Sequence, residues 1–289
     1  MFRRQTTGSV VCVSCGYLVS VNDPQCYHCG RRNPGLWGFA PAFRRLGHDM
    51  GFVRFVIGAC GVVYGLTLLL SVLLGTPLIG GSLMTILAPS ELVLRLFGAS
   101  GAGPVFGDGH WWTVLSANWL HAGLLHIVFN VMWIRQLGPA VAEMYGPGRM
   151  AIIYVVAGAV GFAASSVAGM LPPLLPFLRG AGFTVGASAS IFGLLGALVY
   201  YGRQSGSSLV HGQAVSWAVT LFVFGLIMPG VDNYAHAGGF AGGFLTARLL
   251  NPMKPERIDH LVLGAGCLLL SLLPIVAAIL RIFLAFLLR

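Results

Sequence analysis

Seven apolar stretches alternate with shorter polar segments along the chain. They cover residues 55–74, 117–137, 150–171, 186–201, 213–229, 234–250 and 261–280. A helix needs about 20 residues to cross the hydrocarbon core of a bilayer, so these stretches predict seven membrane-spanning helices. Several are a little short and rich in glycine, which suits helices that are buried among other helices.

The connection between the first two stretches, residues 75–116, has a different pattern. It is still apolar but is interrupted by Pro77, Pro89, Pro104 and many glycines. Irregular backbone exposed to lipid would leave N–H and C=O groups without hydrogen bonds. The pair Trp111 and Trp112 at its end is typical of the membrane interface. We therefore expect a loop with short helices that lie half in the outer leaflet.

Composition supports a membrane protein over a soluble one. Hydrophobic residues make up 56% of the 289 residues, charged residues only 9%, and the mean hydropathy is +0.83. Soluble domains carry about a quarter charged residues. The expected fold class is an all-α polytopic membrane protein.

The net charge is +9, and the distribution of the cations along the chain agrees with the predicted topology. If the N-terminus is cytoplasmic, thirteen cations lie on the inner side: Arg3, Arg4, Arg31, Arg32, Arg44, Arg45, Arg54, Arg135, Arg149, Arg203, Arg248, Lys254 and Arg257. Four lie outside: Arg95, Arg179, Arg281 and Arg289. This bias obeys the positive-inside rule and explains the basic composition without nucleic acid. No cleavable signal peptide is expected in the polar first 50 residues.

The polar amino-terminal segment carries a metal-binding pattern. Cys12, Cys15, Cys26 and Cys29 form two CxxC pairs separated by ten residues. Four thiolates on two tight turns suit tetrahedral zinc, which stabilises segments too short to form a core. We expect a zinc ribbon at residues 1–35 and a linker at 36–53, with His28 as a possible substitute ligand. The ribbon's partner is open: a protein is possible, whereas nucleic acid is not expected, because Arg31 and Arg32 also serve membrane orientation.

Polar groups within spans are costly and therefore candidates for function. The predicted topology brings five of them to the outer side, on the second, fourth and sixth spans: His121, His126, Asn130, Ser188 and His236. Stripes of small residues accompany Ser188 and His236, namely Ala189, Gly193 and Gly196, and Ala235, Gly239 and Gly243. Such faces let membrane helices pack closely. Close packing could bring Ser188 within hydrogen-bond reach of His236, as a serine nucleophile requires.

Acyl transfer by Ser188 also needs hydrogen-bond donors for an oxyanion. The backbone N–H of Ser188, the ring of His126 and the side-chain amide of Asn130 are the natural set, because an imidazole and a carboxamide can both donate.

Three segments carry a resemblance to one family. His121–Asn130 resembles the HxxxxHxxxN element of rhomboid intramembrane serine proteases, Gly186–Gly193 resembles their GxSx nucleophile segment, and Val231–Gly239 resembles their AHxxG segment. They occur in the family's order, and the resemblance covers roughly residues 50–250. It implies a rhomboid-like six-helix core at 54–250, followed by a linker and a seventh transmembrane helix at 251–289.

The resemblance also implies roles for individual residues. Ser188 would be the nucleophile and His236 the general base, in a dyad without a carboxylate, and His126 and Asn130 would form the oxyanion hole. Supporting roles would fall to His121, Gly186, Phe192 and Gly239, with His121 ordering the outer loop and Phe192 packing on His236. Glu143 would tie together the inner loop between Gly138 and Gly148. The chain departs from the family pattern at Ala189, where glycine is commonest, and at Thr113, where arginine is usual.

The expected function is that of an intramembrane serine endopeptidase that cleaves transmembrane segments of other membrane proteins near the outer face of the bilayer. Its partners would be those substrates and the lipids, and catalysis would need no cofactor. We expect it in a bacterial-type inner (plasma) membrane, multi-pass, with the N-terminus in the cytoplasm and the site on the periplasmic, outer side.

Alternatives compete with this interpretation. Ser190 is a rival nucleophile, although it lies nearly 200° around an ideal helix from Ser188. Asp232 either caps the sixth span or orients His236. An inactive relative that escorts membrane clients is one rival function, but such relatives usually lack the serine or the histidine. A transporter is another, and the spans lack the carboxylates and inverted repeats expected of one.

Overall fold

The computed structural model describes residues 3–45, 47, 49–76, 78, 85–172 and 180–288. Pro77, Arg179 and Arg289, on which part of the predicted topology rests, lie outside these residues. Seven long helices dominate the described chain: α2 (Phe52–Leu73), α5 (Leu124–Tyr145), α6 (Pro147–Gly169), α7 (Ser188–Ser205), α8 (Ser208–Ile227), α9 (Asn233–Leu250) and α10 (Ile258–Leu287). They correspond in order to the seven predicted spans.

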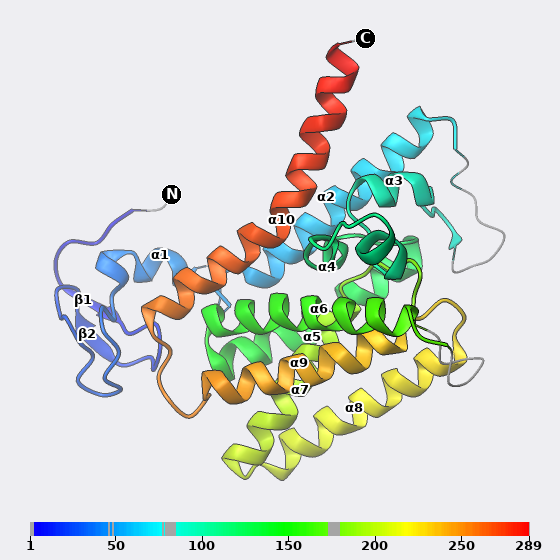
Figure 1. The fold of residues 1–289 in the computed structure, drawn as a ribbon. Helices are drawn as coiled ribbons and strands as arrows, with labels where there is room; N and C mark the ends of the chain where they lie inside the picture. Colours follow the sequence, from blue (N-terminus) through cyan, green and yellow to red (C-terminus); the bar gives the residue numbers. More distant parts are fainter. Residues whose placement is uncertain are drawn as a thin grey trace.

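These helices pack together, and in Figure 1 the C-terminal part of α10 extends beyond the others. Five of them are long and apolar enough to cross a membrane, counting the described residues only: α2, α5, α6, α8 and α10. The other two, α7 and α9, have 18 residues each and contain many small residues. Twelve of the 18 residues of α7 are buried, as expected for a helix surrounded by others. The protein is therefore a multi-pass membrane protein with an all-helical core.

Small residues set the closest helix crossing, between α7 and α9. A Cβ atom on Gly243 would lie 2.1 Å from the carbonyl oxygen of Gly193, and one on Gly239 would lie 2.1 Å from that of Ala189. Helix α6 approaches on the other side, where a Cβ on Gly161 would lie 2.5 Å from the carbonyl oxygen of Ala235. The predicted small-residue faces are thus in contact, and backbone packs on backbone.

The second span begins later than predicted. Instead of starting at residue 117, helix α5 starts at Leu124, and the preceding residues form α4 (Thr113–Ser116) and the 3-10 turn η4 (Ala117–Trp119). Trp119 and Leu120 are fully buried there, which explains their apolar character. His121 therefore precedes the span, contrary to the prediction that it lies within it.

Short helices occupy the described part of the connection after α2, as predicted. They are α3 (Glu91–Leu96) and the π-helical turn η3 (Gly103–Gly107), followed by α4 and η4. Ser90 caps α3 by accepting a hydrogen bond from the Val93 N–H at 3.3 Å. At the end of the connection Trp111 is 66% exposed, which fits an interfacial side chain.

The amino-terminal ribbon is a two-stranded antiparallel sheet with two equivalent turns. Strands β1 (Ser9–Val11) and β2 (Leu18–Ser20) pair with Val10 opposite Val19. Each CxxC pair is followed by a glycine with positive φ, Gly16 at +77° and Gly30 at +73°, a conformation that other residues rarely adopt. The N–H of each glycine returns to the carbonyl of the first cysteine of its pair, at 3.0 and 2.9 Å. The turn η1 (Leu36–Gly38) and helix α1 (Ala40–Arg44) connect the ribbon to α2.

The ribbon contacts the bundle through a buried ion pair. The Arg31 guanidinium lies 3.5 Å from the Glu256 carboxylate, and their side chains are only 1% and 4% exposed. Glu256 lies between α9 and α10 and accepts the backbone N–H of Arg149 in α6 at 2.9 Å. Burial raises the pKa of the Glu256 carboxyl, whereas this hydrogen bond and the positive charge of Arg31 oppose the rise.

Glu256, and not Glu143, ties this end of the bundle together. The predicted loop from Gly138 to Gly148 is largely helical, because α5 continues to Tyr145 and α6 begins at Pro147. Glu143 is exposed on α5. Glycine is required at position 146 between the two helices, because φ is +86° and a Cβ would lie 2.4 Å from the Glu256 carboxyl carbon. The prediction for Glu143 was wrong because helix α5 is longer than its apolar stretch.

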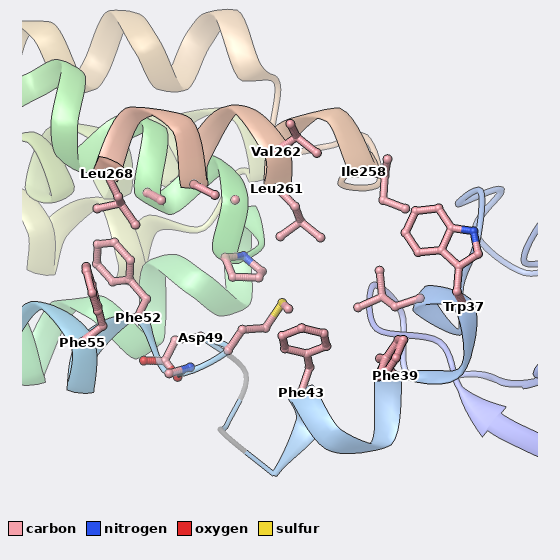
Figure 2. A pocket seen from close by; sticks show the side chains of 17 residues that line it. Trp37, Phe39, Phe43, Asp49, Phe52, Phe55, Ile258, Leu261, Val262 and Leu268 are labelled. Atoms are coloured by element: carbon pink, nitrogen blue, oxygen red, sulfur yellow. Dashed lines mark hydrogen bonds between the residues drawn. The ribbon is translucent and has the colours of Figure 1, made fainter. Parts of the chain in front are cut away.

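An apolar groove of about 530 Å³ lies beside the first turns of α2, α6 and α10, and Figure 2 shows it from close by. Phe52 and Phe55 of α2 line one side, and Leu261 of α10 lines the other. Asp49 at its edge caps α2, because its carboxylate accepts the N–H groups of Gly51 and Val53 at 3.1 and 2.8 Å. The groove lies at the same end of the bundle as the ribbon, which we call the ribbon end.

Candidate active site

Ser188 and His236 meet at the other end of the bundle, which we call the site end. The His236 Nε2 atom lies 2.9 Å from the Ser188 hydroxyl oxygen. Ser188 is the first residue of α7, and His236 lies in the first turn of α9. Because the two helices cross closely at small residues, their first turns are held side by side. A hydrogen bond of this length is the arrangement that a serine nucleophile and its base require.

The ring of His236 is oriented by packing. It stacks on the Phe192 ring with 4.2 Å between the ring centres and an angle of 17° between their planes. The other ring nitrogen, Nδ1, is buried and has no hydrogen-bond partner among the described residues. Asp232 instead caps α9, because its carboxylate accepts the Ala235 N–H at 3.0 Å. The geometry is that of a serine–histidine pair in which no described carboxylate contacts the histidine.

His126 lies in the first turn of α5 and packs on the segment before the serine. A Cβ atom on Gly186 would lie 2.5 Å from the His126 Nε2 atom, and φ at Gly186 is +131°. The His126 Nδ1 atom accepts the Ala122 backbone N–H at 3.3 Å. In a neutral imidazole only one nitrogen carries a proton, so this contact leaves the proton on Nε2. The ring therefore presents a hydrogen-bond donor at Gly186, two residues before Ser188.

Asn130 and His121 surround His126. Asn130 is buried one turn further along α5, and its side-chain amide donates to the His126 carbonyl at 2.7 Å. His121 is fully buried, and its ring contacts that of His126 edge-on, with 5.2 Å between the ring centres. The predicted site residues on α5 thus lie together, with Asn130 fixing the backbone that carries His126.

The two departures at Ala189 and Thr113 are accommodated locally. Ala189 is fully buried, and its methyl group faces Gly161 of α6, where a second Cβ would lie 2.8 Å away. The Thr113 hydroxyl donates to the His110 carbonyl at 2.7 Å. Ala189 therefore fits because glycine stands opposite it, and Thr113 stabilises its own turn.

Ser190 points away from His236. Its hydroxyl is fully buried and bonds the Asn118 side chain at 2.8 Å and the Tyr154 carbonyl oxygen. Asn118 comes from η4, and Tyr154 from α6. Ser190 therefore ties α7 to its neighbours, and its hydrogen bonds are to Asn118 and Tyr154 and not to His236.

Two residues near the site gave no signal in the sequence. Asn118 lies in an apolar stretch, and Ser165 is one of several small residues in α6. Ser165 bonds the Asp232 carboxylate at 2.5 Å. Serines in apolar helices usually bond their own backbone, so only tertiary structure reveals this contact.

The four ribbon cysteines form a second candidate site. Their sulfur atoms all lie within 4.8 Å of one another, with Cys12 to Cys29 at 3.8 Å and Cys15 to Cys26 at 3.7 Å. Four sulfurs on a tetrahedron around zinc, each about 2.3 Å from the metal, would be about 3.8 Å apart. The cluster can therefore hold a metal ion. His28 stacks on Tyr17 instead, with 4.1 Å between the ring centres.

Comparison with known proteins identifies related chains. A family model described as the rhomboid domain matches residues 108–252. Rhomboid protease GluP of Bacillus subtilis is 33% identical over 179 residues, which are 61% of this chain and 33% of GluP. RHOMBOID-like protein 4 of Arabidopsis thaliana is 33% identical over 171 residues, 57% of this chain and 40% of that protein.

A shorter relative is matched over most of its length. The putative rhomboid protease YdcA of Bacillus subtilis is 30% identical over 154 residues, which are 52% of this chain and 72% of YdcA. By contrast, the matched part of the chain spans well under half the length of GluP and of RHOMBOID-like protein 4.

Proposed function

The chain belongs to the rhomboid family of intramembrane serine proteases, and we propose that Ser188 and His236 are its catalytic dyad. The observation that carries the proposal is the 2.9 Å contact between the Ser188 hydroxyl and the His236 Nε2 atom. The chain would act as an endopeptidase on transmembrane segments of other proteins.

The reaction follows from the proposed roles. The Ser188 oxygen attacks the carbonyl carbon of the scissile peptide bond while His236 Nε2 takes the hydroxyl proton. The tetrahedral intermediate collapses when His236 gives this proton to the leaving amine nitrogen. A water molecule, deprotonated by the same histidine, then releases the acyl group from Ser188. The first half-reaction thus leaves Ser188 acylated and His236 neutral. In the second, His236 passes the proton taken from water to the departing Ser188 oxygen, which restores the free dyad.

Three donors would stabilise the oxyanion. Backbone N–H groups in the first turn of a helix have no carbonyl partner within the helix, so the Ser188 N–H at the start of α7 is available. The His126 Nε2 proton next to Gly186 is the second donor. Asn130 would supply the third through the second N–H of its amide, since one already bonds the His126 carbonyl. Each such donor contributes about 3 kcal/mol of transition-state stabilisation in serine proteases.

The supporting residues would act through these groups. Phe192 holds the His236 ring by stacking, and Gly186 gives His126 room to approach. Gly239 lets α9 approach α7, and the His121 ring supports His126 through an edge-to-face contact.

The proposed substrates are membrane helices that unwind locally. An intact helix uses its carbonyl groups internally, so the cut bond must leave the helix before attack. Entry from the side, between α5 and α8, would bring such a segment to the site end. We propose that this end faces the outer, periplasmic side of a bacterial-type inner membrane, with the N-terminus in the cytoplasm; the predominance of cations on the opposite side supports this orientation.

We further propose that the cysteine cluster holds zinc as a structural ion and that the chain is organised as ribbon (1–35), linker (36–53), catalytic core (54–250) and linker with seventh helix (251–289). The sulfur separations of 3.7 and 3.8 Å support a tetrahedral ion. A protein partner for the ribbon remains compatible with its exposed Tyr17 and Tyr27.

Cleavage in reconstituted vesicles tests the function. The purified chain is mixed with a panel of single-span substrates, and wild type is compared with Ser188→Ala and His236→Ala. We expect cleavage by wild type, and a loss of at least 1,000-fold in each variant, since dyad residues act as a unit. Equal cleavage by all three proteins, or none by wild type across the panel, would refute the proposal.

A further inference from the structure

Ser165 connects the helix that carries the histidine to the segment that carries the serine. Its side chain is fully buried in α6, and its hydroxyl donates to the Asp232 carboxylate at 2.5 Å. The same hydroxyl oxygen accepts the backbone N–H of Ala181 at 3.2 Å. One side chain therefore contacts two parts of the chain that are about fifty residues apart in sequence.

Through Asp232, Ser165 is connected to the turn of α9 that carries His236, the proposed base. Asp232 is the N-cap of α9, and one carboxylate oxygen accepts the Ala235 N–H at 3.0 Å. Its backbone carbonyl accepts the His236 N–H at 3.1 Å. The first turn of α9, including the His236 backbone, is thus built on Asp232, and the second carboxylate oxygen of Asp232 is held by Ser165.

Through Ala181, Ser165 is connected to the segment that precedes Ser188, the proposed nucleophile. The segment from Ala181 to Gly186 is held by backbone hydrogen bonds: the Ala181 carbonyl accepts the Ala102 N–H at 2.9 Å, and Thr184 exchanges two bonds with Ser100 at 3.0 and 2.8 Å. Its last member, the Gly186 N–H, donates to the Ala117 carbonyl at 2.9 Å. Ser188 follows two residues later. The segment before Ser188 is therefore ordered by backbone contacts, and Ser165 adds a side-chain contact at its first residue.

We propose that Ser165 is a positioning residue that sets the separation of Ser188 and His236. The inference rests on the proposed function, because it concerns the same reaction. Ser165 touches neither reacting atom and acts through Asp232 and Ala181. Catalytic groups lose much of their effect when they are displaced by about 1 Å. Removal of the Ser165 hydroxyl takes away the hydrogen-bond partner of one Asp232 carboxylate oxygen and of the Ala181 N–H. The first turn of α9 and the segment before Ser188 therefore lose the side chain that connects them.

The neighbouring serine provides a matched control. Ser166 is also fully buried in α6, but its hydroxyl donates to the Phe162 carbonyl of its own helix at 2.7 Å. Ser166→Ala therefore removes the same atom at the same depth without touching α9 or the segment before Ser188. General loosening of α6 would affect both variants alike, whereas positioning would affect only Ser165→Ala.

Steady-state cleavage of one transmembrane substrate in vesicles tests this inference, together with the rate at which a fluorophosphonate labels Ser188. In Ser165→Ala we expect kcat and the labelling rate to fall about tenfold, with KM within twofold of wild type. In Ser166→Ala, kcat, KM and the labelling rate should all stay within twofold of the wild-type values. Because part of the effect of Ser165 passes through Asp232, Ser165→Ala should lower kcat less when Asp232 is already alanine than in the wild-type background.

Asp232→Asn provides a second route if Ser165→Ala does not fold. Asparagine has a single side-chain oxygen. When that oxygen caps the Ala235 N–H, an NH2 donor faces the Ser165 hydroxyl in place of the accepting carboxylate oxygen. We therefore expect kcat to fall while thermal stability stays near wild type. Equal kinetics for Ser165→Ala and Ser166→Ala, an effect on KM alone, or wild-type kcat in Asp232→Asn would overturn the inference. An inactive and unlabelled wild type would instead overturn the proposed function itself.

Discussion

Gly186 shows how one residue links the backbone to the proposed chemistry. Its φ of +131° belongs to a region that side chains rarely adopt, and the His126 ring occupies the space where a Cβ would lie. Glycine is needed there for both reasons at once. The sequence marked Gly186 only through its resemblance to a family motif, because a lone glycine before a helix has many explanations.

Gly186→Ala should therefore damage the site. The new methyl group would lie 2.5 Å from the His126 Nε2 atom, so the ring must move away from the oxyanion position. Together with the cost of the unfavourable φ, about 1–3 kcal/mol, we expect the labelling rate of Ser188 to fall at least tenfold. Gly182→Ala is the control, since a Cβ at Gly182 meets nothing within 4 Å. Equal labelling of both variants would contradict the role of Gly186.

At the scale of elements, the crossing of α7 and α9 was the most predictable feature of the fold. Small residues at helical spacing indicated close packing, and the two helices do pack backbone to backbone. The start of α5 was less predictable, because Trp119 and Leu120 are apolar yet belong to a buried turn before the helix. Hydrophobicity reports burial, and burial alone does not distinguish a span from a buried turn.

Gly243→Ala should test this crossing. Its methyl group would lie 2.1 Å from the Gly193 carbonyl oxygen, so α7 and α9 must separate. We expect a loss of about 1–3 kcal/mol in stability, as for other overpacked sites, seen as a lower thermal midpoint in detergent. Gly212→Ala in α8 is the comparison, because a Cβ there meets nothing within 4 Å and alanine favours a helix. Should both variants melt at the same temperature, the crossing is not as close as described.

At the scale of the whole molecule, the ribbon and the bundle share one buried ion pair. Arg31 follows the second cysteine pair by two residues, and the Cys26 N–H bonds its carbonyl at 2.8 Å. The fold of that turn thus places the guanidinium beside Glu256. The cysteine spacing predicted the ribbon, but nothing in the sequence paired Arg31 with an acid 225 positions away, because long-range charge pairs leave no periodic pattern.

If the cysteine cluster holds zinc, as we propose, removal of the zinc should loosen the structure beyond the ribbon as well as within it. Without an ion the cysteine turns loosen, Arg31 leaves, and Glu256 remains buried without its cation. Hydrogen exchange should then become faster at residues 251–257 as well as at residues 9–32 after chelation. Arg31→Met should give the same change at 251–257, because removal of one partner of a buried pair costs about 3–5 kcal/mol.

Arg32→Met is the matched control, since Arg32 is exposed. It should leave exchange at 251–257 unchanged. If chelation speeds exchange within the ribbon alone, the ribbon is an independent module and the ion pair does not couple it to the bundle.

We propose above that Ser188 is a nucleophile activated by His236. The most direct measurement is mass-spectrometric mapping of the adduct formed when the folded protein in detergent reacts with a fluorophosphonate. We predict one adduct, on Ser188, which persists in Ser190→Ala and is lost in His236→Ala. An adduct on Ser190, or undiminished labelling of Ser188 without His236, would contradict the account.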